Sequence, residues 1–572
     1  MHVKEKIKTI LRALIAFLWR THTKQRVDSV QEIHPKRTNK KMKERITKLL
    51  EALNEGLYER ENELKLALLS SIAGESIFFL GPPGVAKSMV ARRLKYAYKD
   101  ANVFEYLMSR FSTPDEIFGP VSISELKNNK YVRVIDGYLP DAEVVFLDEI
   151  WKAGPSIQNA LLTILNEKIF RNGKMEKPVP MKVLISASNE LPDEEAKMQG
   201  QSLEAMWDRF LVRLEVKHIN DWDNLKEMIK IPSLSSKDED IKLRNIVTEP
   251  INDKEYKEWS KRIDEKEVPK NVLNVIRVIR DKIELYNNSD NNKENTEKQI
   301  LISDRRWRKI VRLMRTSAFL NDRTEVDLMD CFLIKYCIWN RIEQKDTVWQ
   351  FVEDAIEENG YTVSLNLGEI RLDIDNFKKK IDEDTKYYRN TPIKELESVY
   401  NNYYEILNPP DLSNNLITKT DFDNLNNQNR NMYLHFYRTN WNQVQQNSRW
   451  NIRKGNSEIS LFINDKEYQL KNITRTERTQ ITRGPNEYTE KAWDELVNDF
   501  LLTISDITSQ LKEYTEKDSV HLRTNLFVEP ALANIIESHI SSTQKEIEKI
   551  KLSVLEMQNG YKKLKNNDIV TQ

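Results

Sequence analysis

A glycine-containing loop between a strand-forming run and a helix-forming run constrains this fold most. Residues 81–88 read Gly-Pro-Pro-Gly-Val-Ala-Lys-Ser, after an apolar run at 77–80 and before a helix-compatible run at 89–98. Backbone N–H groups of such a loop wrap a polyphosphate, Lys87 reaches the terminal phosphates, and the Ser88 hydroxyl holds Mg²⁺. Ala86 stands where the general pattern has its second glycine, and its Cβ crowds the backbone unless φ stays negative. The predicted nucleotide-binding residues are Gly81, Pro82, Pro83, Gly84, Val85, Ala86, Lys87 and Ser88.

A second nucleotide element follows downstream. The apolar run 144–147 reads as a buried strand and ends in Asp148 and Glu149. Asp148 is placed to hold Mg²⁺ together with Ser88, and Glu149 to polarise an attacking water. The next predicted strand, 183–187, is followed by Asn189, whose amide could orient that water. Solvated turn carboxylates are the alternative for such a pair, but the phosphate loop upstream favours catalysis.

Arg209 and Arg213 lie four residues apart in the segment 207–213, and we expect them on one helical face. No carboxylate in the segment matches both, so they are candidates for stabilising charge on a transferred phosphoryl group, within one subunit or across two. A surface pair that contacts solvent or local carboxylates is the open alternative.

Several motifs together resemble those of MoxR-clade AAA+ ATPases, and most of all the RavA subfamily, over residues 44 to about 343. They are GPPGVAKS, FSTPDEIFGP (111–120), FLDEIWKAGPSIQNALLTILNE (146–167), FRNG (170–173), SASNELP (186–192) and DRFLVRL (208–214). Ala86 fits the loop of that subfamily. The resemblance makes residues 81–88 the Walker A loop and Asp148 with Glu149 Walker B. It makes Asn189 sensor 1 and Arg209 an arginine finger acting in trans.

The same resemblance places sensor 2 at Arg305, with Arg306 as the second choice, and makes both expected nucleotide contacts. It also implies ATP with Mg²⁺ and a homo-hexameric ring whose pore is faced by 111–120. Between Phe170 and Val183, the pair Asn172-Gly173 amid residues suited to extended structure predicts a hairpin, and the resemblance makes this hairpin an insertion of the clade. The family's described work is chaperone-like remodelling, commonly with a partner that carries a von Willebrand factor A domain. The protein client stays open.

The chain is predicted to be α/β, with an AAA+ P-loop parallel sheet core and a helical lid. We expect a basic arm at 1–43, the core at 44–221, the lid at 222–345, and a mostly helical C-terminal region at 346–572. In that last region, 365–408 and 490–565 read as helices around a small β module at about 430–485, with a hairpin at 459–470. A heptad stripe from Ile536 to Leu564 predicts an antiparallel intrachain coiled coil, with 365–408 as the simplest partner.

Composition excludes several other classes. Lys plus Arg and Asp plus Glu both total 89, but residues 1–48 hold 14 basic against 4 acidic side chains. Cys331 and Cys337 suit core thiols of a cytoplasmic protein, and the seven histidines lack ligand spacing. The apolar stretch 7–19 is shorter than the ~20 residues of a membrane span. It is expected to be an amphipathic helix, and docking on protein is favoured over docking on a membrane surface. No integral membrane segment is predicted.

Three functions compete. The first is an ATP-driven ring that remodels a protein. The second is a nucleic-acid-directed motor, which the basic arm would serve, although the arm is short and no reading helix or metal finger accompanies it. The third is a nucleotide-dependent switch or scaffold, against which the presence of Glu149 and Arg209 argues. Nucleic acid is therefore not expected as the partner.

Overall fold

The structure is a computed structural model that describes residues 41–192, 202–231, 236–289, 292, 298–362, 365–411, 415–439, 441, 443–564 and 569–570. It forms two compact units. The first contains Met1–Asn366 and Thr508–Lys545, and the second contains Leu367–Ile507 and Glu546–Gln572. The predicted basic arm at 1–43 lies almost entirely outside the described residues.

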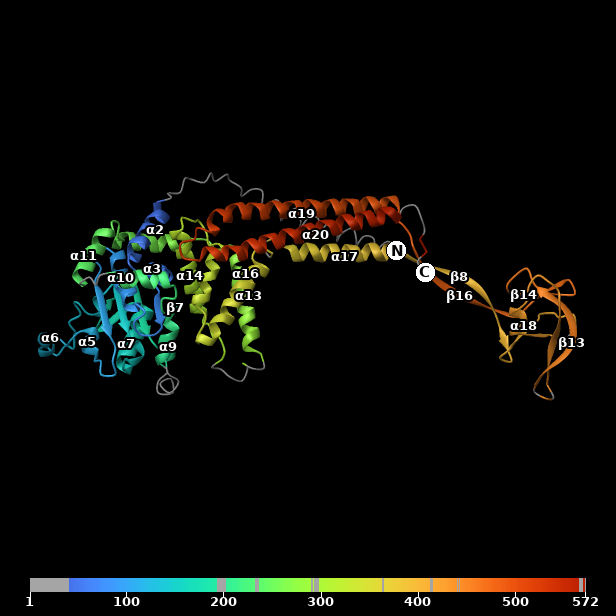
Figure 1. The fold of residues 1–572 in the computed structure, drawn as a ribbon, viewed down its shortest axis with the longest axis horizontal. Helices are drawn as coiled ribbons and strands as arrows, with labels where there is room; N and C mark the ends of the chain where they lie inside the picture. The colour runs from blue at the N-terminus through green and yellow to red at the C-terminus, as the bar shows by residue number, and fades with distance from the viewer. Residues whose placement is uncertain are drawn as a thin grey trace. The chain divides into compact units, whose positions relative to one another are not determined.

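A five-stranded parallel sheet organises the first unit, in the order β2-β3-β6-β1-β7. The strands are β1 (Ser76–Leu80), β2 (Val103–Leu107), β3 (Val144–Asp148), β6 (Val183–Ser188) and β7 (Phe210–Glu215). Residues of β1, β3 and β6 are buried, as expected for a parallel sheet covered on both faces. Figure 1 shows α2 (Lys41–Asn54), α3 (Glu61–Ala73), α7 (Pro155–Glu167) and α9 (Ser202–Arg209) around this sheet. Helix α4 (Lys87–Leu94) follows β1. The predicted α/β class is confirmed.

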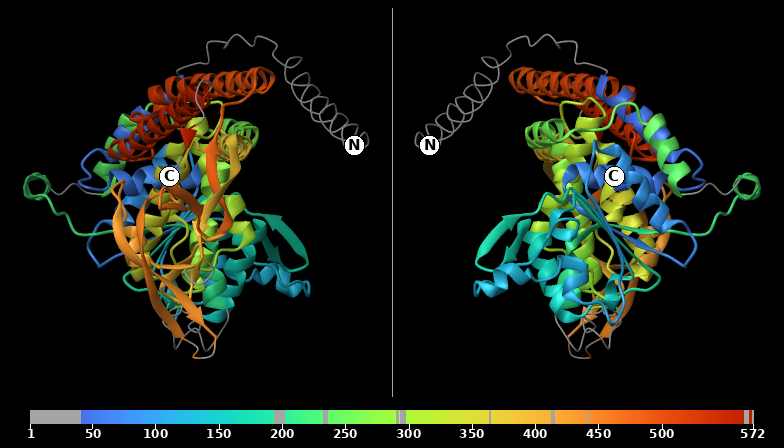
Figure 2. Two further views of the ribbon diagram at one scale, coloured as in Figure 1. Left: turned by 90° about the vertical axis from the view of Figure 1, so that its right-hand side faces the viewer. Right: turned by 90° about the vertical axis from the view of Figure 1, so that its left-hand side faces the viewer.

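The inserted hairpin is also present. Strands β4 (Ile169–Asn172) and β5 (Met175–Pro178) pair antiparallel around a turn in which Gly173 has φ +66°. The short helices α5 (Pro114–Phe118) and α6 (Ile123–Lys127) follow β2. Figure 2 shows the hairpin projecting from the core beside α6 in both views. Phe111, at the start of the segment expected to face a pore, is 90% exposed.

A helical subdomain follows the sheet, and its last helix extends to residue 359, beyond the predicted boundary at 345. Its α-helices are α10 (Trp222–Lys230), α11 (Ser236–Ile246), α12 (Asp253–Asp264), α13 (Lys270–Asn287), α14 (Asp304–Leu320), α15 (Leu328–Cys331) and α16 (Lys345–Asn359). Cys331 and Cys337 are free and fully buried here, so the prediction of core thiols is confirmed.

The second unit departs from the prediction. Helix α17 (Leu367–Thr385) ends well before residue 408, because Lys386–Leu396 forms strand β8 and pairs along its whole length with β16 (Asn472–Thr482). The prediction of helix throughout 365–408 is therefore wrong. Cross-strand pairing with the Thr- and Ile-rich β16 outweighs the helical pattern of β8.

The β module accordingly begins at residue 386 rather than near 430. A seven-stranded antiparallel sheet has the order β15-β14-β13-β12-β11-β10-β9, and β17-β16-β8 form a separate three-stranded sheet. The remaining elements are β9 (Ser398–Val399), β10 (Tyr403–Glu405), β11 (Leu416–Thr418), α18 (Lys419–Asp423), β12 (Arg430–Arg438), β13 (Gln443–Lys454), β14 (Ser460–Ile463), β15 (Lys466–Gln469) and β17 (Ile569–Val570). The β14–β15 hairpin turns at Asn464 and Asp465, both with positive φ, as the sequence predicted.

Two long helices follow β16: α19 (Glu487–Leu522) and α20 (Ala533–Lys563). Heptad positions of α20 such as Ile547 and Val554 are buried. In the second unit, Tyr561 of α20 packs on Trp493 of α19, with ring centroids 5.2 Å apart. Helix α17 joins the bundle through Phe377, which packs on Trp493 as well. The expected helix pair is thus a three-helix arrangement in which α19 is a principal partner.

Candidate functional site

The glycine-containing loop connects β1 to α4 at the carboxyl edge of the sheet. Lys87 is the first residue of α4, and its Nζ donates to the carbonyls of Gly81 (2.6 Å) and Pro82 (2.9 Å). Burial lowers the pKa of Lys87, and the carboxylates of Asp148 and Glu149 counter that effect. The ammonium group therefore lies inside the concave loop, directed back over its backbone.

Ala86 adopts φ +64°, in the left-handed region. The sequence allowed an alanine here on the condition of negative φ, and the structure does not meet that condition. The loop requires this backbone conformation to begin α4, so Ala86 carries a strain of about 1–2 kcal/mol for an L-residue. Gly84 adopts φ +81° without such a cost.

Two contacts that the sequence did not reveal support the loop. Arg60 is 4% exposed, and its Nε donates to the Val85 carbonyl (3.0 Å) while Nη2 donates to the Lys217 carbonyl (2.6 Å). At Gly81, an added Cβ would lie 2.2 Å from the Val216 carbonyl oxygen. The loop is therefore held against the chain segment that leaves β7. Neither contact has a sequence signature, because each joins residues far apart in the chain.

The predicted acidic pair ends β3 beside this loop. Burial raises the pKa of Asp148, and a hydrogen bond from the Ser88 hydroxyl partly offsets it. Ser88 and Asp148 thus present neighbouring hard oxygen donors, a set that suits Mg²⁺. Glu149 adopts φ +53°, and its Oε2 accepts from Ser188 Oγ (3.4 Å) and lies 3.4 Å from Lys152 Nζ.

A cavity of about 1130 Å³ opens beside the first part of the loop. Gly81 and Asn189 contribute to its lining, together with Ile342 from the helical subdomain. Asn189 is exposed there, one residue beyond the end of β6. The further lining residues are Glu59, Arg60, Glu63, Leu80, Pro82, Pro83, Glu215, Val216, Lys217, His218, Ile219 and Asn220.

The arginines assigned from the sequence lie elsewhere, around Asp208. Its Oδ2 accepts from Arg209 Nη1 and from Arg305 Nη2, both at 2.8 Å, and Oδ1 lies 3.6 Å from Arg306 Nη1. Arg305 also donates to Asn166 Oδ1 (3.2 Å) at the end of α7. Burial raises the pKa of Asp208, but the three guanidinium groups outweigh it and hold the pKa below its usual range. The open alternative, pairing with a local carboxylate, therefore holds for Arg209.

Arg209 and Arg213 do not share a helical face. Helix α9 ends at Arg209, and Arg213 lies within β7, where its side chain is 1% exposed. The Arg213 guanidinium packs 3.9 Å from the Trp207 ring and donates to the carbonyls of Trp207 (2.9 Å), Phe210 (3.2 Å) and Trp339. The Arg213 guanidinium therefore has a structural role, and it is too deeply buried to contact a phosphate.

Arg306 is likewise buried, at 3% side-chain exposure. It donates to the carbonyls of Cys337 (2.5 Å), Asp208 (2.9 Å), Phe210 (2.9 Å) and Leu211 (3.0 Å). Arg305, one residue earlier, is 44% exposed. Arg305 is therefore the arginine of this pair that a ligand can reach.

The predicted site residues divide between two edges of the sheet. Residues 81–88, Asp148 and Asn189 lie at the carboxyl ends of the strands, whereas Asp208 precedes the first residue of β7 at the amino edge. β7 spans about 17 Å from Phe210 to Glu215 at ~3.3 Å per residue. Within one chain, Arg209 and Arg305 thus lie a strand length from the phosphate loop.

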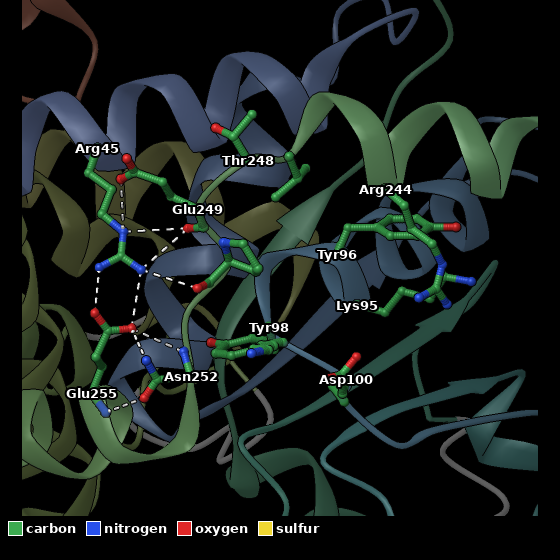
Figure 3. Close-up of a pocket in the computed structure, with 14 residues that line it drawn as sticks. Arg45, Lys95, Tyr96, Tyr98, Asp100, Arg244, Thr248, Glu249, Asn252 and Glu255 are labelled. Carbon is green, nitrogen blue, oxygen red and sulfur yellow. Dashed lines mark hydrogen bonds and ion pairs between the residues drawn. The ribbon is translucent and has the colours of Figure 1, made fainter.

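A separate cavity of about 750 Å³ lies between α2, the end of α4 and α11 (Figure 3). Among its lining residues Arg45 bonds Glu255, whereas Lys95 and Arg244 both bond Asp240, which lies outside the lining. Within the described residues, no cluster of His, Cys, Asp and Glu has the geometry of a metal site. No described helix is long and apolar enough to cross a membrane.

The sheet, the phosphate loop with its acidic pair, and the helical lid define an AAA+ ATPase. A family model described as the MoxR domain in the MoxR-vWA-beta-propeller ternary systems matches residues 44–254, and one for an AAA lid domain matches residues 271–352. The chain belongs to the MoxR-type AAA+ ATPases.

Two relatives from Methanocaldococcus jannaschii share most of their length with this chain. The uncharacterized protein MJ0079 is 36% identical, over 64% of this chain and 86% of its own, and the uncharacterized protein MJ0812 is 38% identical, over 52% and 72%. A crystal structure from Cytophaga hutchinsonii covers 55% of this chain and 94% of its own, at 16% identity and a TM-score of 0.42, which adds nothing to the assignment.

Proposed function

We propose that this protein hydrolyses ATP to ADP and phosphate in a homo-oligomeric ring, a hexamer by family resemblance, and couples the cycle to remodelling of a protein. The observation that carries the proposal is the separation of the site between two edges of the sheet. A phosphate loop with Asp148 and Glu149 lies at one edge, and exposed Arg305 beside Arg209 lies at the other. Joining subunits edge to edge would complete each site with residues of two chains.

Each residue has a separate role in this mechanism. Backbone N–H groups of residues 81–88 and the ammonium of Lys87 bind the phosphates, while Ser88 and Asp148 would hold Mg²⁺. The ion would supply charge neutralisation on the phosphate oxygens. Glu149 orients and polarises the attacking water, with Asn189 on the neighbouring strand end. Arg209 of the adjoining subunit would stabilise the charge that develops on the transferred group.

Family membership supports the choice of partner. The matching MoxR domain is described from systems that also contain a vWA component, so a protein with a von Willebrand factor A domain is the proposed partner. Chaperone-like remodelling, a RavA-like subfamily assignment and a cytoplasmic location are parts of the same proposal. The described segment 111–120, with Phe111 exposed, is the proposed pore-facing element.

Steady-state ATP hydrolysis and light scattering with ATP test the proposal. We expect wild type to turn over as a ring, Glu149→Gln to assemble but stall, and Arg209→Ala to assemble with turnover lowered by about 10³-fold. Arg244→Ala is the control for Arg209→Ala, because Arg244 is an exposed arginine that pairs with Asp240 and lies outside the proposed chemistry. A monomeric wild type that does not hydrolyse ATP would refute the ring mechanism and favour a nucleotide-dependent switch.

A further inference from the structure

Among the described residues, the carboxylate of Asp208 is the only group that accepts hydrogen bonds from both Arg209 and Arg305. The exposed fractions of the side chains are 33% for Asp208, 15% for Arg209 and 44% for Arg305. One oxygen, Oδ2, accepts from both guanidinium groups at 2.8 Å. Arg305 lies 97 residues beyond Asp208 in the chain, and the shared carboxylate holds its guanidinium beside that of Arg209.

Charge explains why such a contact is needed. Arg209 and Arg305 repel each other, and that repulsion lowers the pKa of Arg209 in addition to its burial. Without a carboxylate between them, the two cations would separate. Arg209 ends α9 of the sheet domain, whereas Arg305 lies in the first turn of α14 in the lid. The shared carboxylate therefore also ties the lid to the sheet domain at this edge.

The position of this trio determines where it can act. α14 is anchored at the amino edge of the sheet, since Lys309 bonds Glu75 (2.5 Å) and Arg312 donates to the Ala73 carbonyl (3.0 Å), both just before β1. The phosphate loop follows β1 at its other end. Arg305 is therefore directed away from the phosphates of its own chain, and shares the orientation of Arg209.

We propose that Asp208 is a positioning residue that holds Arg209 and Arg305 as one unit, which serves the nucleotide of the adjoining subunit. The inference rests on the proposed ring ATPase and adds one feature to it: a single carboxylate sets the geometry of both arginines that reach across the subunit interface. Asp208 itself makes no contact with the nucleotide.

Mixed rings test this directly. A Lys87→Ala subunit lacks a working phosphate loop but retains the arginines, and an Asp208→Asn subunit retains the loop. Each variant alone is expected to be impaired, with kcat of Asp208→Asn lowered roughly 10- to 100-fold by misplaced arginines and KM for ATP little changed. In a 1:1 mixture, about a quarter of the interfaces join two intact halves, so activity returns to about a quarter of wild type.

Three further samples decide between outcomes. A mixture of Arg209→Ala and Lys87→Ala subunits must recover ATPase activity in the same way. A mixture of Arg305→Met and Lys87→Ala subunits tests the lid arginine, which is exposed, so that its substitution should leave folding intact. Asp264→Asn is the matched control. It removes the carboxylate that pairs with Arg312, another arginine of α14, and it should leave turnover unchanged.

Recovery with Arg209→Ala but not with Arg305→Met or Asp208→Asn would overturn the inference and leave the ring ATPase intact. If wild type is active but the mixture of Arg209→Ala and Lys87→Ala subunits does not recover ATPase activity, the arginines do not act across the subunit interface and the inference fails. An inactive wild type would refute the proposed function, and the inference with it.

Discussion

Adjacent arginines in the lid, Arg305 and Arg306, should respond to the same substitution in opposite ways. Both contact Asp208, but Arg306 is 3% exposed and donates to four backbone carbonyls, whereas Arg305 is 44% exposed. Methionine keeps most of the volume of either side chain and removes its charge. The comparison therefore separates a structural arginine from a functional one.

The expected cost at Arg306 follows from its contacts. Removing one partner from a buried charged network costs about 3–5 kcal/mol, because the remaining groups stay buried and unpaired. Asp208 keeps Arg209 and Arg305 and is one-third exposed, which places Arg306→Met near the lower limit, about 3 kcal/mol. An exposed pair contributes less than about 1 kcal/mol, so Arg305→Met should leave the free energy of unfolding nearly unchanged.

Urea unfolding followed by tryptophan fluorescence measures the difference, since Trp207 and Trp339 lie at this junction with ring centroids 5.8 Å apart. With a slope of about 3 kcal/mol/M, Arg306→Met should lower the midpoint by about 1 M and Arg305→Met by less than about 0.3 M. Turnover should show the reverse for the folded proteins, with Arg305→Met losing about 10²-fold. Equal midpoints for the two variants would refute the structural assignment of Arg306.

Three further substitutions probe the loop and the lid. Ala86→Gly removes about 1–2 kcal/mol of left-handed strain against about 0.5–1 kcal/mol of glycine entropy, so the urea midpoint should rise slightly; a fall would contradict the strain. Gly81→Ala places a Cβ 2.2 Å from the Val216 carbonyl and should weaken ATP binding in titration calorimetry, whereas unchanged affinity would show that the loop can shift freely. Burial lowers the pKa of Lys335 to about 8, which disfavours its charged form in the folded state. Wild-type thermal stability should therefore rise from pH 8 towards 10.5, whereas Lys335→Met should lack that rise, and equal slopes would argue against the shift.

The nucleotide-binding half of the fold was predictable because its determinants are local. The strand at 144–147, the acidic pair after it and the hairpin turn at Asn172–Gly173 each depend on residues adjacent in sequence. The second unit was less predictable, because β8 is a strand only through pairing with β16, about 80 residues away in the chain. Its pattern alone is compatible with continuing α17.

The arginines show why the site was harder to predict than the fold. A spacing of four indicates a shared face only if helix continues, but the chain changes from α9 to β7 between Arg209 and Phe210. Beyond that point the side-chain period is two, so Arg213 lies within the sheet, where Trp207 and the carbonyls around it bind the guanidinium. Which arginines a ligand can reach therefore depends on the residue at which α9 ends. Helix ends are the features that a single sequence predicts least accurately.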